Sequence, residues 1–300
     1  MDPLSLLWLF FILASLQPAV ARQWLLMQRR FALAAISRQR RSTVITVIHR
    51  QESMSLFGFP IMRFIDIDDA ESVLMAINET PPGRPIDIIL HTPGGMVLAA
   101  QQIAGALADH DGPVRAIVPH YAMSGGTLIS LSADEIFIDA HAALGPVDPQ
   151  LGEYPARSVI EASEQPGDHE DRTLIMADVA RKALVQVEEF TTRMLERHMS
   201  PEEARKSARL MATGTWTHDH PLQLRELQAL GLPVRVGVPQ QVRDLMTLYP
   251  QPRGRTPAVE YVPGPPAPSI PRRKEVPAGS RRPAPAGAGV SANSRPGGSS

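Results

Sequence analysis

Two short glycine turns, each lying between an apolar strand-like run and a helix-like segment, constrain the fold of this chain more than any other feature. The first, HTPGG at His91–Gly95, follows the apolar run Ile86–Leu90. The second, SGG at Ser124–Gly126, comes after the apolar run Val114–Val118. The turns are 124 − 95 = 29 positions apart, which leaves room for one helix and one strand between them. If the two strands are parallel neighbours, both turns lie at the same edge of a sheet.

The chain between residues 43 and 138 alternates such strands with helices. We expect strands at Thr43–Ile48, Ile86–Leu90, Val114–Val118 and Glu135–Ile138, a further short apolar segment at Phe64–Ile67, and helices at Asp68–Asn78, Met96–Asp109 and Thr127–Ala133. Asp68 is the expected N-cap of the first helix. Continuous apolar strands separated by helices favour an α/β fold with a parallel sheet covered on both faces.

Segments downstream of this alternation are predicted from their own local signals. Ser158–Asp171 is polar and predicts a loop, whereas Leu174–Met199 has apolar residues at helical spacing and predicts a long helix. The run Ser200–Glu203 has the pattern of a capping box with proline at the first helical position, so a second helix is expected there. A turn at Gly214–Pro221 leads into a helix that ends near Gly231.

Ser124 is the strongest candidate for a functional group. A serine at a strand-to-helix turn, with small residues behind it, is held exposed and rigid, as a nucleophilic hydroxyl must be. The alternative is that Ser124 only caps the following helix. The Pro-Gly-Gly of the first turn would supply free backbone N–H groups, which can stabilise the oxyanion that forms when a nucleophile attacks a carbonyl.

Three motifs in chain order, HTPGG, AMSGG and DPQLGEY, resemble the Clp-fold serine peptidases: the Clp proteolytic subunit, signal peptide peptidase A and above all the serine dehydrogenase proteinase (SDH) family. The resemblance covers roughly residues 43–236. It implies a Clp/crotonase-like superfold, a protein or peptide substrate and assembly of identical subunits into a ring. It also implies that Ser124 is the nucleophile and that the N–H groups of Gly95 and Gly125 form the oxyanion hole.

The general base stays open at this stage. The Clp subunit uses a histidine in a loop after the serine, and at that position this chain has Asp148. The signal peptide peptidases use a lysine, which slightly favours Lys182 in the long predicted helix, provided that its amine is buried. His218, with the carboxylate of Asp219 beside it, is the competing base. Asp148 could orient a base or bind backbone N–H groups in its own loop. His91 and His120, near the two turns, are weaker candidates.

Composition excludes several kinds of chemistry. The 300 residues include no cysteine, which excludes disulfides, thiolate catalysis and cysteine-bound zinc. The net charge of −1 gives no reason to expect a nucleic-acid partner. The cluster His218–His220 lacks further ligands, so no metal site is expected. No phosphate-binding loop is present and no cofactor is expected.

The N-terminal segment Leu4–Ala21 is apolar and uncharged, and it has about the minimum length of a membrane helix. Six arginines follow it by residue 41, so the positive-inside rule predicts a single-pass anchor at residues 1–21 with the bulk of the chain in the cytoplasm. The alternatives are a cleaved signal peptide, since Ala19–Ala21 resembles a cleavage site, and a buried core helix.

The rest of the chain divides by composition. Residues 22–42 are basic and amphipathic and would form a juxtamembrane helix, either on anionic lipid headgroups or as a plain spacer. Residues 43–240 would form the Clp/crotonase-like peptidase domain. Proline, glycine, alanine, serine and arginine dominate residues 251–300, so residues 241–300 are expected to be a disordered tail.

The function expected from these features is that of a membrane-anchored serine peptidase. Two other classes of protein compete with it. A crotonase-type acyl-CoA enzyme would use the same paired backbone donors on a thioester enolate and would not need Ser124. A non-catalytic membrane scaffold of the same fold would explain why the Clp-type histidine is absent.

Overall fold

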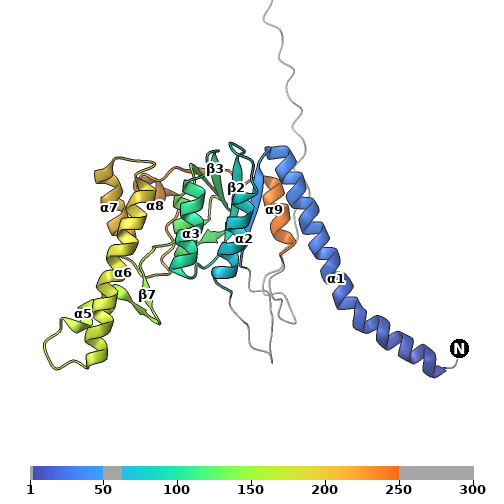
Figure 1. Ribbon diagram of the computed structural model, residues 1–300, viewed down its shortest axis with the longest axis horizontal. Helices are drawn as coiled ribbons and strands as arrows, with labels where there is room; N and C mark the ends of the chain where they lie inside the picture. Colours follow the sequence, from blue (N-terminus) through green and yellow to red (C-terminus); the bar gives the residue numbers. More distant parts are fainter. Residues whose placement is uncertain (1–2, 50–62, 250–300) are drawn as a thin grey trace, which may run out of the picture. The chain divides into compact units, whose positions relative to one another are not determined.

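A computed structural model of the protein describes residues 3–49 and 63–249 (Figure 1). Its centre is a sheet of five strands: β1 (Thr43–Ile48), β2 (Ile86–His91), β3 (Val114–Val118), β5 (Glu135–Ile138) and β9 (Val234–Val236). The strands lie in the order β1-β2-β3-β5-β9, and all neighbouring pairs are parallel. This confirms the predicted parallel sheet, to which β9 adds a strand that the sequence pattern did not predict.

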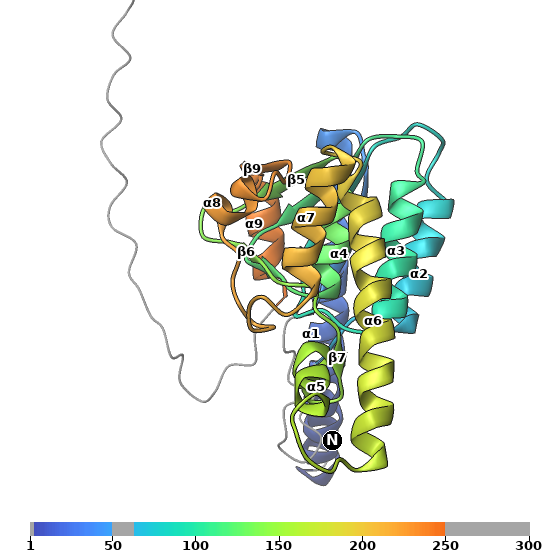
Figure 2. The same ribbon diagram turned by 90° about the vertical axis from the view of Figure 1, so that its left-hand side faces the viewer.

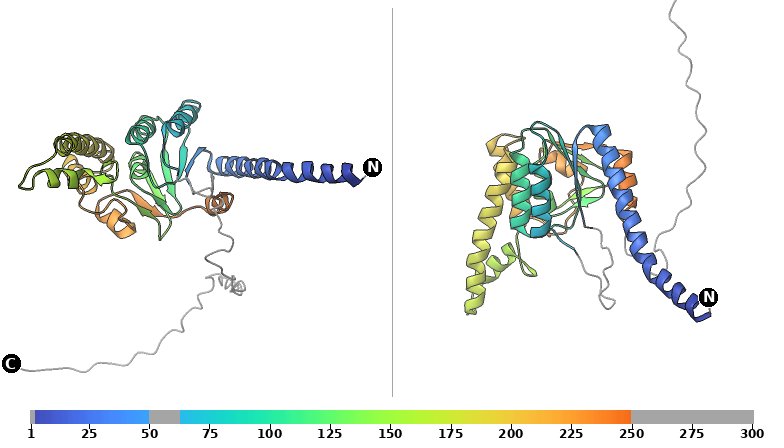
Figure 3. Two further views of the ribbon diagram at one scale, coloured as in Figure 1. Left: turned by 90° about the horizontal axis from the view of Figure 1, so that it is seen from below. Right: turned by 45° about the vertical axis from the view of Figure 1, so that its right-hand side comes forward.

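Helices cover both faces of the sheet (Figure 3). One face carries α2 (Ile67–Asn78), α3 (Val97–Ala108) and α4 (Gly125–Leu131), and the other carries α1 (Pro3–Arg40) and α9 (Gln240–Thr247). The side chains of a central strand therefore alternate between two apolar cores, which is why such a strand has an uninterrupted apolar sequence.

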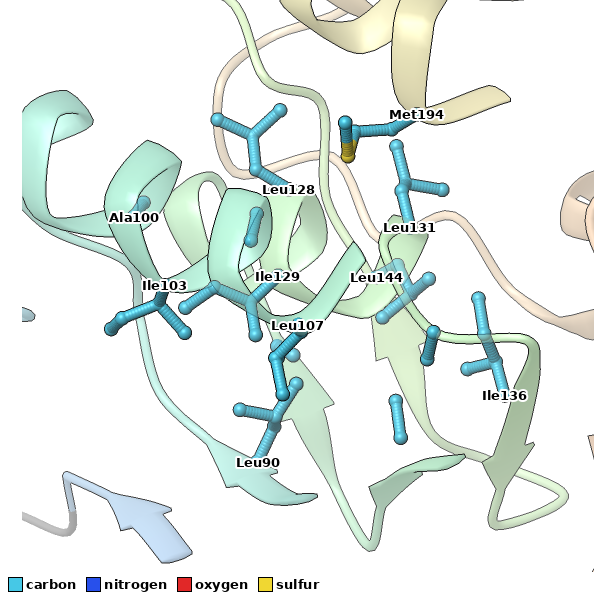
Figure 4. Packing of buried hydrophobic residues seen from close by; sticks show 14 of the residues in the cluster. Leu90, Ala100, Ile103, Leu107, Leu128, Ile129, Leu131, Ile136, Leu144 and Met194 are labelled. Atoms are coloured by element: carbon cyan, nitrogen blue, oxygen red, sulfur yellow. The ribbon is translucent and has the colours of Figure 1, made fainter. Parts of the chain in front are cut away.

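Strand β2 illustrates this arrangement, because all of its residues are buried. Leu90 packs in the larger core, where Figure 4 shows it beneath Leu107 of α3 and Ile129 of α4. Ile89 points to the opposite face and packs in the smaller core with Ile36 of α1. The sheet is thus fixed from both sides, and the loops that follow its strands start from a rigid base.

A second group of elements lies beside the sheet (Figure 2). It consists of the short strands β4 (Tyr121–Ala122), β6 (Ala143–Leu144), β7 (Gln150–Leu151) and β8 (Tyr154–Pro155), followed by the helices α5 (Ala156–Ser163), α6 (Asp171–Leu195), α7 (Pro201–Ala212) and α8 (Leu224–Ala229). β4 pairs with β6, and β7 forms a hairpin with β8. The predicted long helix and the capping box at Ser200 and Glu203 are confirmed.

Two local predictions are wrong. The loop expected at Ser158–Asp171 begins with helix α5, because Ile160 packs against Leu184 of α6 and this burial overrides the polar composition. The N-cap of α2 is Asp66 and not Asp68. The short apolar segment Phe64–Ile67 contributes an isolated parallel bridge, from Ile65 to Gly95.

Helix α1 runs without interruption across the boundary expected between an anchor and a juxtamembrane helix. Its C-terminal part is fixed to the domain, since Arg29 Nε donates to the Leu248 carbonyl over 2.8 Å and Arg40 pairs with the fully buried Asp87. Arg115 also pairs with Asp87, over 2.7 Å. Residues 240–247 form α9, which packs against α1, so the tail does not begin at residue 241 as expected.

The transmembrane anchor expected at residues 1–21 gains no support. Within residues 3–49 and 63–249, no helix is long and apolar enough to cross a lipid bilayer. Most side chains of residues 1–21 lie outside the described part of the chain, as does the tail expected at residues 251–300.

Candidate active site

Ser124 stands at the point where β4 turns into α4, with backbone angles of φ 49° and ψ −115°. A non-glycine residue is strained in this region, and such strain is typical of functional turns in which a nucleophile is held exposed. Ser124 occupies the N-cap position, yet its side chain makes no capping hydrogen bond. The alternative that this serine serves only as a helix cap therefore loses its physical basis.

The two glycine turns meet at the C-terminal edge of the sheet, as the spacing predicted. Thr92 of the first turn bridges to the second, since its N–H donates to the Tyr121 carbonyl over 3.2 Å and its carbonyl accepts from Met123 N–H over 3.0 Å. These bonds form a parallel bridge that fixes the first turn against Ser124. The second turn is also closed on itself, because the hydroxyl of Thr127 in α4 donates to the Ala122 carbonyl of β4 over 2.8 Å.

The contact between the turns is so close that only glycine fits. A Cβ on Gly94 would lie 2.8 Å from the Cβ of Ser124 and 3.2 Å from the nitrogen of Gly125. A Cβ on Gly95 would lie 2.2 Å from the carbonyl oxygen of Ile65, well inside any real contact distance. The Pro-Gly-Gly sequence is thus a packing requirement as well as a source of backbone donors.

Two backbone N–H groups lie beside Ser124 and suit an oxyanion. Among the described residues, neither Gly95 N–H nor Gly125 N–H donates to an acceptor. They are close together, since the Cβ position of Gly125 lies 3.6 Å from the nitrogen of Gly95. Paired donors near a nucleophile can stabilise the negative charge that develops on a carbonyl oxygen.

Two of the candidates for the base pair with each other. His218 Nδ1 lies 2.9 Å from Asp148 Oδ1, and the Gln150 side-chain amide donates to Asp148 Oδ2 over 2.7 Å. The Asp148 side chain is only 3% exposed, whereas that of His218 is 32% exposed. A buried carboxylate that orients a partly exposed imidazole is the arrangement found in hydrolase triads.

This His218–Asp148 pair is tied to the serine turn by the backbone. Leu144 and Leu222 exchange two backbone hydrogen bonds of 3.1 and 2.8 Å, which brings the loop of His218 next to the strand that leads to Asp148. Gly145 lies against Met123, since a Cβ on Gly145 would be 2.6 Å from the Met123 methyl carbon. Within the described residues, Ser124 Oγ itself makes no hydrogen bond.

The other candidates lie apart or in other roles. Lys182 is on the outer face of α6 with a side chain that is 69% exposed and paired with Asp178 over 2.5 Å, so the burial expected of a lysine base is absent. His120 is exposed. His91 is buried, with its ring 4.4 Å from the ring of Tyr121. No group of three metal-ligating side chains occurs in the described residues.

Sequence reasoning missed a cluster of three polar residues behind the first turn. His49 Nδ1 lies 2.8 Å from Thr92 Oγ1, and His49 Nε2 lies 3.1 Å from Asp69 Oδ2. Burial raises the pKa of the Asp69 carboxyl, but hydrogen bonds from His49 and from the Asp66 N–H outweigh it and hold that pKa below its ordinary value. No sequence signal links these three residues, because His49 follows β1, Asp69 lies in α2 and Thr92 lies in the turn after β2.

The parallel sheet with helices on both faces defines an α/β protein and fits a Clp-like fold. The chain matches the ClpP-like SDH-type serine proteinases over residues 1–275 and belongs to that family.

Similar proteins agree with this membership. The uncharacterized protein MJ0137 of Methanocaldococcus jannaschii is 49% identical over 273 residues, which cover 88% of this chain and 96% of that protein. The uncharacterized protein MJ1495 of the same organism is 47% identical over 258 residues, covering 86% and 88%. The membrane protein NfeD1b of Bacillus subtilis is 23% identical over 137 residues, covering 45% of this chain and 29% of that protein.

Proposed function

We propose that this protein is a serine peptidase in which Ser124 attacks the carbonyl carbon of a peptide bond. The observation that carries the proposal is the strained Ser124 backbone beside the N–H groups of Gly95 and Gly125. Strain of this kind costs on the order of 1–3 kcal/mol and persists where the surrounding structure enforces it, which is common at catalytic turns. Membership in a serine proteinase family supports the same chemistry.

The proposed reaction uses His218 as the general base and Asp148 as the residue that orients it. The Ser124 hydroxyl adds to the carbonyl carbon while its proton passes to His218, and the oxyanion accepts hydrogen bonds from Gly95 and Gly125. Collapse of the adduct breaks the carbon–nitrogen bond, and the proton on His218 moves to the departing amine. A water molecule then attacks the Ser124 ester while His218 takes its proton. That proton returns to the Ser124 oxygen as the carboxylic acid is released. Catalytic hydrogen bonds are often long in free enzymes and tighten when substrate binds.

A fluorophosphonate probe tests this function directly. In the full-length wild-type protein, the Ser124 oxygen should displace fluoride from the probe and carry the phosphonyl group. Peptide mass spectrometry locates this group. Ser124→Ala should remain unlabelled and should lose casein and peptide hydrolysis by several orders of magnitude. Wild-type protein that neither labels nor hydrolyses would refute the peptidase.

The same probe separates the other two classes of protein. A non-catalytic scaffold is favoured by the missing hydrogen bond on Ser124 Oγ, and it would leave the wild type unlabelled. A crotonase-type acyl-CoA enzyme would keep its activity in Ser124→Ala, because the paired donors of an enolate site do not require the hydroxyl.

Exposed apolar side chains on α1 and on α6 form two surfaces for which we propose partners. The N-terminal part of α1 exposes large apolar side chains, including Trp8, Leu16, Val20, Trp24 and Phe31. We propose that this part attaches the domain to a lipid surface, which the similarity to a protein described as a membrane protein also supports. On α6, exposed apolar residues suit contact with a second copy in a ring, and these are Leu174, Ile175, Val179 and Val185.

A further inference from the structure

A chain of hydrogen bonds connects helix α2 to the first glycine turn. Asp69 in the first turn of α2 contacts His49 Nε2 over 3.1 Å, and His49 Nδ1 contacts the Thr92 hydroxyl over 2.8 Å. The Thr92 hydroxyl in turn accepts the N–H of Gly94 over 3.1 Å. His49 and Thr92 are both buried, so water does not compete for these bonds.

The last bond occupies one of the two glycine amides of the turn. Because Thr92 Oγ1 takes the Gly94 N–H, that amide is directed into the protein, and the next amide, Gly95 N–H, is the one without an acceptor among the described residues. Gly94 and Gly95 have φ angles of 106° and 158°, which glycine adopts without steric penalty. This flexible pair of glycines is held from two sides. Ile65 N–H donates to the Gly94 carbonyl over 2.7 Å, and the Thr92 hydroxyl adds a second constraint by accepting the Gly94 N–H.

The hydroxyl cannot set its own direction, because it rotates freely until a partner fixes it. Asp69 contacts His49 Nε2, and His49 Nδ1 lies 2.8 Å from the Thr92 hydroxyl oxygen. The Thr92 hydroxyl also lies 3.4 Å from the Gly94 carbonyl, to which it can donate. With either partner, the Thr92 oxygen accepts the N–H of Gly94. His49 thus fixes the place of the Thr92 hydroxyl, and Thr92 holds the Gly94 amide.

We propose that His49 and Thr92 are positioning residues that hold the oxyanion turn, through Gly94, in the orientation that presents Gly95 N–H to the reacting carbonyl. This inference rests on the proposed serine-hydrolase function of the site. Asp69 completes the chain, but it also belongs to the capping box of α2, where it accepts from Asp66 N–H over 3.1 Å. A substitution of Asp69 would change both the hydrogen-bond chain and the cap of α2. The test is therefore made at His49 and Thr92.

The test measures the rate at which a fluorophosphonate labels Ser124 in the full-length chain, separated into the binding and covalent steps. Thr92→Val removes the hydroxyl and keeps the side-chain shape, while Thr92→Ser restores the hydroxyl. His49→Phe removes both bonds, and His49→Asn keeps a group that reaches Thr92. His110→Ala is the matched control, since it removes a half-buried histidine contact to the Arg84 carbonyl at 2.7 Å in a loop away from the site.

We expect the covalent step to slow by roughly 10-fold or more in Thr92→Val and His49→Phe, because small misplacements at a reacting centre can lower rates by about 100-fold. Thr92→Ser and His49→Asn should stay within about threefold of the wild type, as should His110→Ala, and the binding step should change little. Equal rates in Thr92→Val and the wild type would overturn the inference, as would equal losses in Thr92→Val and Thr92→Ser. A wild type that is never labelled would overturn the proposed function itself.

Discussion

His218 and Asp148 form a 2.9 Å contact between residues that are 70 positions apart, and one of them is buried while the other is partly exposed. In the Clp proteolytic subunit, as the sequence resemblance implies, a histidine occupies the position that Asp148 has here. At this position the present chain has a carboxylate, and the imidazole that contacts it comes from the loop before α8.

Substitutions should show whether His218 or Lys182 is the general base. His218→Ala should lower kcat by roughly 100-fold or more, and Asp148→Asn should also lower it, since the imidazole loses its orienting partner. The double variant should be no slower than the slower single variant, because residues that act as a unit are not additive. Lys182→Ala should keep wild-type turnover, and a large loss there would contradict the exposed position of this lysine.

Relief of backbone strain should make Ser124→Gly more stable than Ser124→Ala. Both variants lack the hydroxyl and should be inactive, but only glycine adopts φ 49° and ψ −115° without strain. Strain at such a residue is about 1–3 kcal/mol, and the added chain entropy of glycine offsets roughly 0.5–1 kcal/mol of its relief. Denaturant titration of the two variants measures the difference, and a Ser124→Gly variant less stable than Ser124→Ala by about 0.5–1 kcal/mol would show that the turn is not strained.

Substitution of Gly95 should damage the site through packing. In Gly95→Ala the new methyl group would meet the backbone of Ile65, which cannot move away like a flexible side chain. We expect a loss of roughly 1–3 kcal/mol in the free energy of unfolding, together with loss of probe labelling. Gly105→Ala in α3 is the control, since nothing lies within 4 Å of its new Cβ, and it should gain roughly 0.5–1 kcal/mol.

Acid should remove a stabilising contribution of Asp69. Burial of this carboxyl raises its pKa, but the hydrogen bonds from His49 and the Asp66 N–H lower it more, so the folded pKa lies below the ordinary 3.8. A carboxyl with a lowered folded pKa stabilises the fold above its unfolded pKa, and this contribution is lost as the pH falls through the folded value. The difference in unfolding free energy between wild type and Asp69→Asn should thus be present at about pH 5 and shrink below about pH 4. Asp68→Asn, an exposed neighbour, should show no such change.

Binding to lipid vesicles tests the proposed role of α1. The full-length chain should float with vesicles of phosphatidylglycerol and phosphatidylcholine, and added salt should weaken this binding because arginines follow the apolar side chains. Replacement of Val20 and Trp24 by glutamate should reduce flotation several-fold. The same replacement at Leu174 and Ile175 of α6 is the control and should leave it unchanged. Equal losses in both variants would contradict a specific role for α1.

Much of the fold follows from local sequence patterns. The strands at residues 43–48, 86–91, 114–118 and 135–138 are predicted within one residue, because a strand buried on both faces needs a continuous apolar run. The capping box at Ser200 is likewise a local hydrogen-bond pattern that four residues contain. Helix α5 was missed because its polar sequence gains stability from α6, a contact that no local pattern records.

For the candidate site, too, local sequence patterns predict one part and tertiary packing determines the rest. The sequence by itself determined the two glycine turns and Ser124, since the spacing of one helix and one strand places both turns at one sheet edge. Only the tertiary structure decided that His218 meets Asp148, that Lys182 faces solvent, and that Asp69 and His49 stand behind the first glycine turn. The physical reason is range: backbone geometry acts over a few residues, whereas a hydrogen bond between side chains depends on how distant segments are packed together.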